Sequence, residues 1–88
     1  MSIEELKYKL KVMIIEECEK EEISADDISD DVEIFSHESG LDLDSVDALQ
    51  ISMALQHHYN IRIPDPKEFR RVVTTINNLA NYISDKNG

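Results

Sequence analysis

The sequence predicts an all-α fold: a small four-helix bundle, with three longer helices, one short helix and a long first loop. Two observations predict it. In three segments the apolar residues recur every three or four positions, which is the period of an amphipathic helix. Before each helical segment stands a Ser, Asp or Thr, whose side-chain oxygen accepts hydrogen bonds from the free N–H groups of a helix start. We expect a single domain over residues 1–88, because a chain of this length has room for only one core.

Charge and composition exclude several classes of protein. The net charge is −10, and 16 of the 19 acidic residues precede residue 48. So acidic a chain is a poor ligand for nucleic acid and suits basic protein surfaces better. It has no apolar run of membrane-spanning length and no signal-peptide pattern at its start. With one cysteine, Cys18, it fits a reducing compartment, and we expect a cytoplasmic monomer that binds neither membranes nor nucleic acid.

A first amphipathic helix is expected over residues 3–18. Ser2 and Glu5 have the spacing of a capping box at its start. Its apolar face is formed by Ile3, Leu6, Leu10, Met13 and Ile14. The other face alternates glutamates with Lys7, Lys9 and Lys11, a pattern typical of a solvated surface. We interpret Cys18 as a half-buried residue at the helix end rather than a reactive thiol, because its acidic neighbours disfavour the thiolate.

A long acidic connection, residues 19–44, separates this helix from the next. Loops of such length are uncommon unless side chains hold them down, so we expect its apolar residues to pin it across the helices, with a short helical turn near residues 24–31. These residues are Ile23, Ile28, Val32, Ile34, Phe35, Leu41 and Leu43. A calcium-loop alignment from Asp27 to Glu38 places Val32 where a glycine is required, so no metal site is predicted.

The second helix is expected over residues 45–59 and carries two apolar stripes. Asp44 is its predicted N-cap, with Asp47 as the acid of a capping box. One stripe should face the core: Ala48, Ile51, Ala54, Leu55 and Tyr59. The other, made of Val46, Leu49 and Met53, is rotated away from it. Either the helix is buried on nearly all sides, or this second stripe is an exposed strip for a partner; the sequence favours the second interpretation.

Ser45 stands in the first turn of this helix, and we expect it at the surface. Backbone N–H groups at a helix start lack intrahelical partners, and the helix dipole gives this end a partial positive charge. Such an end suits a phosphate group. The helix is predicted to end at Asn60, which tolerates a left-handed conformation. His57 and His58 just before it are expected to be exposed, and they lack metal-ligand spacing.

The last third of the chain holds two more helix starts. Asp65 precedes a proline and is the predicted cap of a short helix that runs to about residue 72. Thr74 or Thr75 then caps a final helix. Its apolar face is made of Ile76, Leu79, Ala80 and Ile83. The tail from Asp85 onward is expected to fray.

No catalytic arrangement is apparent. Ser45 has no base at a helical spacing and lacks the glycine-flanked turn of hydrolase nucleophiles. We interpret His37, in the preceding loop, as a solvated residue. The chain has two glycines and no glycine-rich phosphate loop. We therefore do not expect an enzyme.

Taken together, these segments resemble the acyl carrier protein family. Asp44-Ser45-Val46 at a helix start, after a long acidic loop, is similar to the Asp-Ser-Leu motif of that family. The similarity continues through residues 53–55, 61–65, 74–76 and 80–83, so it covers nearly the whole chain.

The resemblance implies that Ser45 carries a covalent 4′-phosphopantetheine, which a phosphopantetheinyl transferase transfers from coenzyme A. It implies that the thiol of this arm holds acyl groups as thioesters, for fatty-acid or specialised lipid or polyketide-type biosynthesis. Asp44 and Ile63 would lie near the arm. The transferase and the acyl-processing enzymes would recognise positions along the second helix, namely Asp44, Val46, Asp47, Leu49 and Met53.

Two other functions remain open. A carrier of this kind can hold an aminoacyl or peptidyl group, and a helical module of the same fold can bind partners without any modification. The acidity and the Ile63-Pro64-Asp65 segment favour an acyl cargo, and a serine at position 45 favours modification. Many members of the family have glutamates later in the second helix, where this chain has glutamines and histidines, so we hypothesise a specialised carrier with its own partner enzymes. These positions are Gln50, Gln56, His57 and His58.

Overall fold

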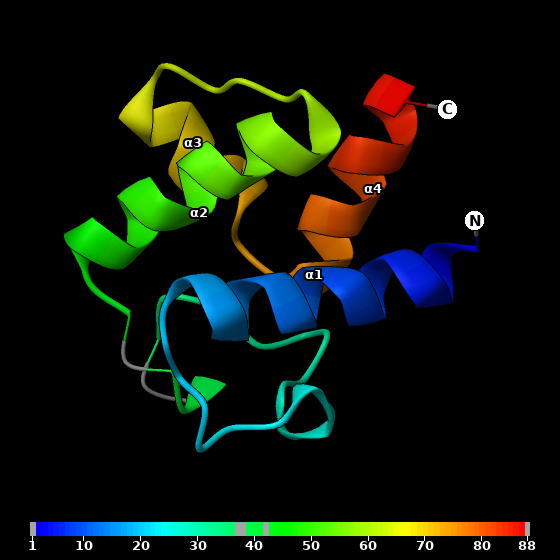
Figure 1. Cartoon of the computed structure of the whole chain (residues 1–88). Coiled ribbons are helices and arrows are strands. Elements are labelled where there is room, and N and C mark those ends of the chain that lie inside the picture. Colours follow the sequence, from blue (N-terminus) through cyan, green and yellow to red (C-terminus); the bar gives the residue numbers. More distant parts are fainter. Residues whose placement is uncertain (1, 37–38, 42, 88) are drawn as a thin grey trace.

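The computed structural model describes residues 2–36, 39–41 and 43–87, and these contain four α-helices and, in the long first loop, the 3-10 turn η1 (Figure 1). In chain order they are α1 (Ile3–Glu17), η1 (Ala25–Asp27), α2 (Ser45–Tyr59), α3 (Pro66–Val72) and α4 (Ile76–Asn87). The predicted all-α architecture, with three longer helices, one short helix and a long first loop, is confirmed. No helix in the described ranges is long and apolar enough to span a membrane.

The helix starts follow from single side chains. Ser2 Oγ accepts the Glu5 N–H at 3.2 Å, Asp65 Oδ1 accepts the Lys67 N–H at 2.9 Å, and the hydroxyl of Thr75 accepts the N–H of residue 78 at 3.0 Å. Each bond satisfies an N–H group that the helix itself leaves unpaired. Thr75 is therefore the threonine that caps α4. α2 ends as predicted at Asn60, whose φ of 57° is left-handed.

The two other helix ends, those of α1 and α4, compare differently with the prediction. α1 ends at Glu17 with Cys18 as its C-cap residue, which agrees with the predicted end at about Cys18. α4 continues through Asn87, so it includes residues 85–87, which were expected to leave the helix. Lys86 Nζ lies 5.5 Å from the ring centroid of Tyr82, one helical turn earlier, and this cation–π contact stabilises the last turn.

α1 lies at the centre of the fold, in contact with α2, α4 and η1 (Figure 1). All buried apolar side chains of the described residues except Ala25 form one cluster, to which every α-helix contributes. The best-buried large side chains of the helices are Leu10, Ile14, Ile51, Leu55, Ile76 and Leu79. The second stripe of α2, made of Val46, Leu49 and Met53, does not belong to this cluster.

The long first loop belongs to this core. Ile28, Ile34 and Leu41 are 3 %, 1 % and 1 % exposed. Four other apolar residues of the loop are half-buried: Ile23, Val32, Phe35 and Leu43. Ser39 is also buried, and its hydroxyl contacts the carbonyl oxygens of Ile34 and Ser36 and accepts the Leu41 N–H, so this polar group is satisfied. The prediction that apolar residues pin the loop is confirmed, and η1 lies where a short helical turn was expected.

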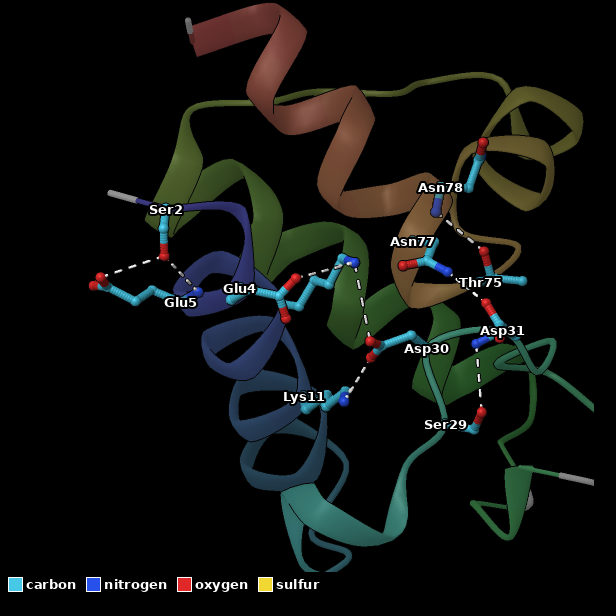
Figure 2. A network of polar contacts seen from close by, with 11 residues as sticks. Ser2, Glu4, Glu5, Lys11, Ser29, Asp30, Asp31, Thr75, Asn77 and Asn78 are labelled. Atoms are coloured by element: carbon cyan, nitrogen blue, oxygen red, sulfur yellow. Dashed lines mark hydrogen bonds and ion pairs between the residues drawn. The ribbon is translucent and has the colours of Figure 1, made fainter.

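Polar contacts also hold the loop to α1 and α4 (Figure 2). Lys11 Nζ lies 2.6 Å from Asp30 Oδ1, an atom with no other hydrogen-bond partner among the described residues, and Lys7 Nζ lies 4.0 Å from Asp30 Oδ2. The Asn77 N–H donates to the Asp30 carbonyl at 3.2 Å, and Asn77 Nδ2 donates to Asp31 Oδ1 at 2.6 Å. We call these five residues the Asp30 clasp.

The prediction of a solvated lysine face on α1 is wrong for Lys7 and Lys11, which belong to the Asp30 clasp. The side chains of Lys7 and Lys11 are only 18 % and 15 % exposed, because the loop returns across this face and places Asp30 between them. Lys9, which points elsewhere, is exposed as expected. Two of the three lysines therefore have a structural role.

Candidate functional site

Ser45 is the first residue of α2, and it is exposed. Its hydroxyl takes part in no hydrogen bond with the part of the chain that the structure describes. The preceding N-cap residue, Asp44, has extended backbone torsions, so the chain turns into the helix at this point. A group bonded to Ser45 Oγ would extend into solvent without disturbing the core.

Asp44 and Asp47 form a complete capping box around Ser45. Asp44 Oδ1 accepts the N–H groups of Val46 and Asp47, both at 3.0 Å, and Asp47 Oδ2 accepts the Asp44 N–H at 3.1 Å. The bonds from the Asp47 and Val46 N–H groups hold the pKa of Asp44 below its usual value. The N–H groups of Val46 and Asp47 are therefore occupied by Asp44, and the predicted capping box is confirmed.

The strip made of Val46, Leu49 and Met53 is exposed. These side chains are 63 %, 61 % and 58 % exposed and lie at i, i+3 and i+7 on the outer side of α2. The other stripe faces the core, with Ile51, Ala54 and Leu55 buried. Of the two interpretations of α2, the exposed strip is confirmed. It begins at the residue that follows Ser45.

The structure does not bring Ile63 to the surface around Ser45. Ile63 is 7 % exposed and belongs to the core cluster. Two grooves of about 230 and 250 Å³ lie elsewhere, one between α1 and the end of α2 and the other between the loop and α3. Neither is lined by Ser45 or Ile63. His37 and Glu38, which the sequence analysis weighed, lie outside the described residues.

Loss of the Asp44 cap is expected to lower the melting temperature in a pH-dependent way. Because folding lowers the pKa of Asp44, its contribution to stability is present above the unfolded-state pKa of about 3.9 and is lost as the pH falls through the lower folded value. Asp44→Ala should therefore melt earlier than the wild type at pH 7, and the difference should shrink toward pH 2. Asp44→Asn, which keeps an accepting oxygen, is the control. An equal difference at pH 7 and pH 2 would contradict this assignment.

Cys18 lies under the first turn of α2. It is 8 % exposed, and its Sγ is 4.0 Å from the Asp47 carbonyl oxygen. Burial first, and then the negative charge of Asp47, raises the pKa of the Cys18 thiol to about 11. Cys18 is thus buried, not half-buried as expected, while its interpretation as a helix-end residue rather than a reactive thiol agrees with this environment.

The folded chain is expected to alkylate slowly at this thiol. A shift of the thiol pKa from the ordinary value of 9.0 to about 11 leaves on the order of 100-fold less thiolate at pH 8. Iodoacetamide should therefore modify Cys18 at least about 100-fold more slowly in the native chain than in the guanidinium-unfolded chain, as followed by intact mass. Similar rates in both states would mean that this thiol is neither buried nor raised in pKa.

Comparison with known proteins identifies the family to which the chain belongs. The family model described as "Phosphopantetheine attachment site" matches residues 9–83, which include α2, α3 and most of α1 and α4. The chain belongs to this family. A relative, the acyl carrier protein of Picosynechococcus sp., is 29 % identical over 85 residues, which cover 97 % of this chain and 95 % of that protein.

The phosphopantetheine attachment-site family consists of carriers. A domain of this family binds 4′-phosphopantetheine covalently and is not itself an enzyme. The structure fits such a group, because an exposed hydroxyl stands free at a helix start beside an exposed apolar strip. When attached, the arm supplies a thiol that forms thioesters; the chain supplies the anchoring oxygen and the surface around it.

Proposed function

We propose that Ser45 is the attachment residue and that the chain carries acyl groups as thioesters on the 4′-phosphopantetheine arm. The matched range contains six serines, and their hydroxyls differ. The hydroxyls of Ser24, Ser29 and Ser36 are used in local hydrogen bonds. Ser39 is buried and Ser52 is half-buried. Among these described serines, Ser45 alone is exposed with an uncommitted hydroxyl, and this observation carries the proposal.

An acyl cargo is favoured over an aminoacyl or peptidyl one. The relative that aligns with nearly the whole chain is called an acyl carrier protein. The pathway we propose is fatty-acid biosynthesis or a specialised lipid or polyketide-type biosynthesis. The absence of acidic residues between Asp47 and Asp65 supports the specialised version, because basic docking patches would find few charges along the rest of α2.

The proposed partners are a phosphopantetheinyl transferase and acyl-processing enzymes that dock beside Ser45. Val46, Leu49 and Met53 offer them apolar contacts, since these side chains have no role in the core. Asp44 and Asp47 lie at the same end of α2, where they orient a basic side chain of the partner. We further propose a monomeric, cytoplasmic carrier in which Cys18 stays reduced.

Intact-mass measurement tests the proposal. The wild-type chain, incubated with coenzyme A and a broad-specificity phosphopantetheinyl transferase, should gain the mass of one 4′-phosphopantetheine. Ser45→Ala should gain nothing, while Ser52→Ala should react like the wild type. Circular dichroism of both variants serves as the control for folding. Modification of Ser45→Ala, or no modification of the wild type by any transferase tried, would reject the assignment and favour the unmodified interaction module.

A further inference from the structure

Lys20 lies at the junction between the end of α1 and the start of α2. The last turn of α1 closes in a Schellman motif, in which Glu19 has a left-handed φ of 55° and the Lys20 N–H donates to the Ile15 carbonyl oxygen at 2.9 Å. Two residues before Lys20, Cys18 Sγ lies 4.0 Å from the Asp47 carbonyl oxygen, so this end of α1 contacts the first turn of α2 (Figure 1). The backbone of Lys20 is therefore held close to the start of α2.

The charge of Lys20 acts on residues of both helices. Lys20 is half-buried, and its ammonium group forms no ion pair with the carboxylates that the structure describes. After the N–H groups of Asp47 and Val46, its positive charge is a further cause that lowers the pKa of Asp44. Burial and then Asp47 raise the pKa of the Cys18 thiol to about 11, and the charge of Lys20 opposes this rise. An uncommitted ammonium group thus stands near the capping box of α2.

A phosphate bonded to Ser45 would stand between two carboxylates. Asp44 precedes Ser45 and Asp47 follows it by two residues, so a phosphate at this position is repelled by like charges on both sides. The N–H groups of Val46 and Asp47, which could offset this repulsion, are occupied by Asp44. A cationic side chain beside the start of α2 supplies the missing compensation.

We propose that Lys20 is a positioning residue that pairs with the phosphate of a group bonded to Ser45 Oγ. Between Lys11 and Arg62 the chain has no other lysine or arginine. Lys11 is committed to Asp30 at 2.6 Å, and Arg62 follows the opposite end of α2. The inference rests on the proposed function, which places the phosphate of the arm on that oxygen. Such a pair limits the orientations of the arm where it leaves the helix.

A full-length chain that carries phosphoserine at position 45 tests the pairing by ³¹P NMR titration. The second ionisation of phosphoserine has its midpoint at about pH 6, and a nearby cation lowers this midpoint. Lys20→Gln should raise the midpoint by about half a pH unit, the size expected for one partly exposed ion pair. Lys20→Arg keeps the charge and should restore the original midpoint. Lys9→Gln, which removes the same charge from an exposed residue near the other end of α2, should leave it unchanged.

Two outcomes would overturn the inference: the midpoint stays in place in Lys20→Gln, as a purely structural role predicts, or it moves as far in Lys9→Gln. The chain with the arm attached gives a second readout. The ε-carbon signal of Lys20 should move on attachment while that of Lys9 stays, and an unmoved Lys20 signal would contradict the pairing.

The two proposals fail separately, because the phosphoserine titration needs no transferase. If no transferase modifies the chain, the proposed function fails, and the titration still decides whether Lys20 meets a phosphate at Ser45. If the arm is attached and the midpoint does not respond to Lys20→Gln, the attachment proposal stands and the pairing is rejected.

Discussion

Ile34→Ala is expected to lower the free energy of unfolding by about 3 kcal/mol, as much as a truncation inside a central helix. Ile34 lies in the long first loop, but it is 1 % exposed and packs in the main core cluster. Its backbone N–H donates to the Thr74 carbonyl at 2.8 Å, so the site has little freedom to collapse around the missing carbons. Urea denaturation at pH 7, followed by circular dichroism, measures the change.

The matched control is Ile23→Ala in the same loop. Ile23 is only half-buried, so its truncation should cost about 1 kcal/mol or less. If Ile34→Ala costs no more than this control, the loop is not part of the core, and it unfolds separately from the helices. A large cost with an unchanged slope against urea would show that loop and helices unfold together.

Asp30→Asn is expected to lower the free energy of unfolding by about 2 kcal/mol, between the values of exposed and buried ion pairs. The side chains of Lys7 and Lys11 are less than one-fifth exposed, and their ammonium groups lie 4.0 and 2.6 Å from the Asp30 carboxylate. Without its charge, the poorly hydrated Lys11 ammonium loses its partner, and Lys7 keeps only Glu4, whose Oε1 is 3.9 Å away. Asp26→Asn, an exposed carboxylate on η1, should cost almost nothing and serves as the control.

A double-mutant cycle separates this contact from general effects. If the Lys11–Asp30 pair carries the cost, Lys11→Met should recover about half of it in the Asp30→Asn background, because the unpaired ammonium is removed. Additive losses would show that the two side chains act independently, which contradicts the clasp. Hydrogen exchange of the Asn77 amide, which donates to the Asp30 carbonyl, should speed up in Asp30→Asn.

The helices could be predicted where their signals are local. α2 runs from Ser45 to Tyr59 as expected, because an N-cap at Asp44 and a left-handed residue at Asn60 mark its ends. Lys7 and Lys11 could not be assigned in this way. A helical pattern shows that they oppose the apolar face, but only the path of a loop twenty residues later shows that this side is covered.

The same distinction applies to the candidate site: its local features could be predicted from the sequence, and those that depend on packing between distant segments could not. The exposure of Val46, Leu49 and Met53 follows from the angle between two stripes on one helix, and the structure agrees. The neighbourhood of Ile63 depends on how an extended segment packs against the helices, which periodicity does not show; the structure buries it in the core. The occupied N–H groups of Val46 and Asp47 could be predicted from the sequence, since the predicted capping box uses them.

Fragment-ion mass spectrometry of the modified wild-type chain tests most directly which residue carries the arm. The chain is loaded with 4′-phosphopantetheine, digested, and fragmented to locate the added mass. We predict that all of it lies on Ser45, at the exposed first residue of α2. Added mass on Ser39, Ser52 or any residue other than Ser45 would contradict the account, because the free hydroxyl beside the exposed strip would then not be the anchor.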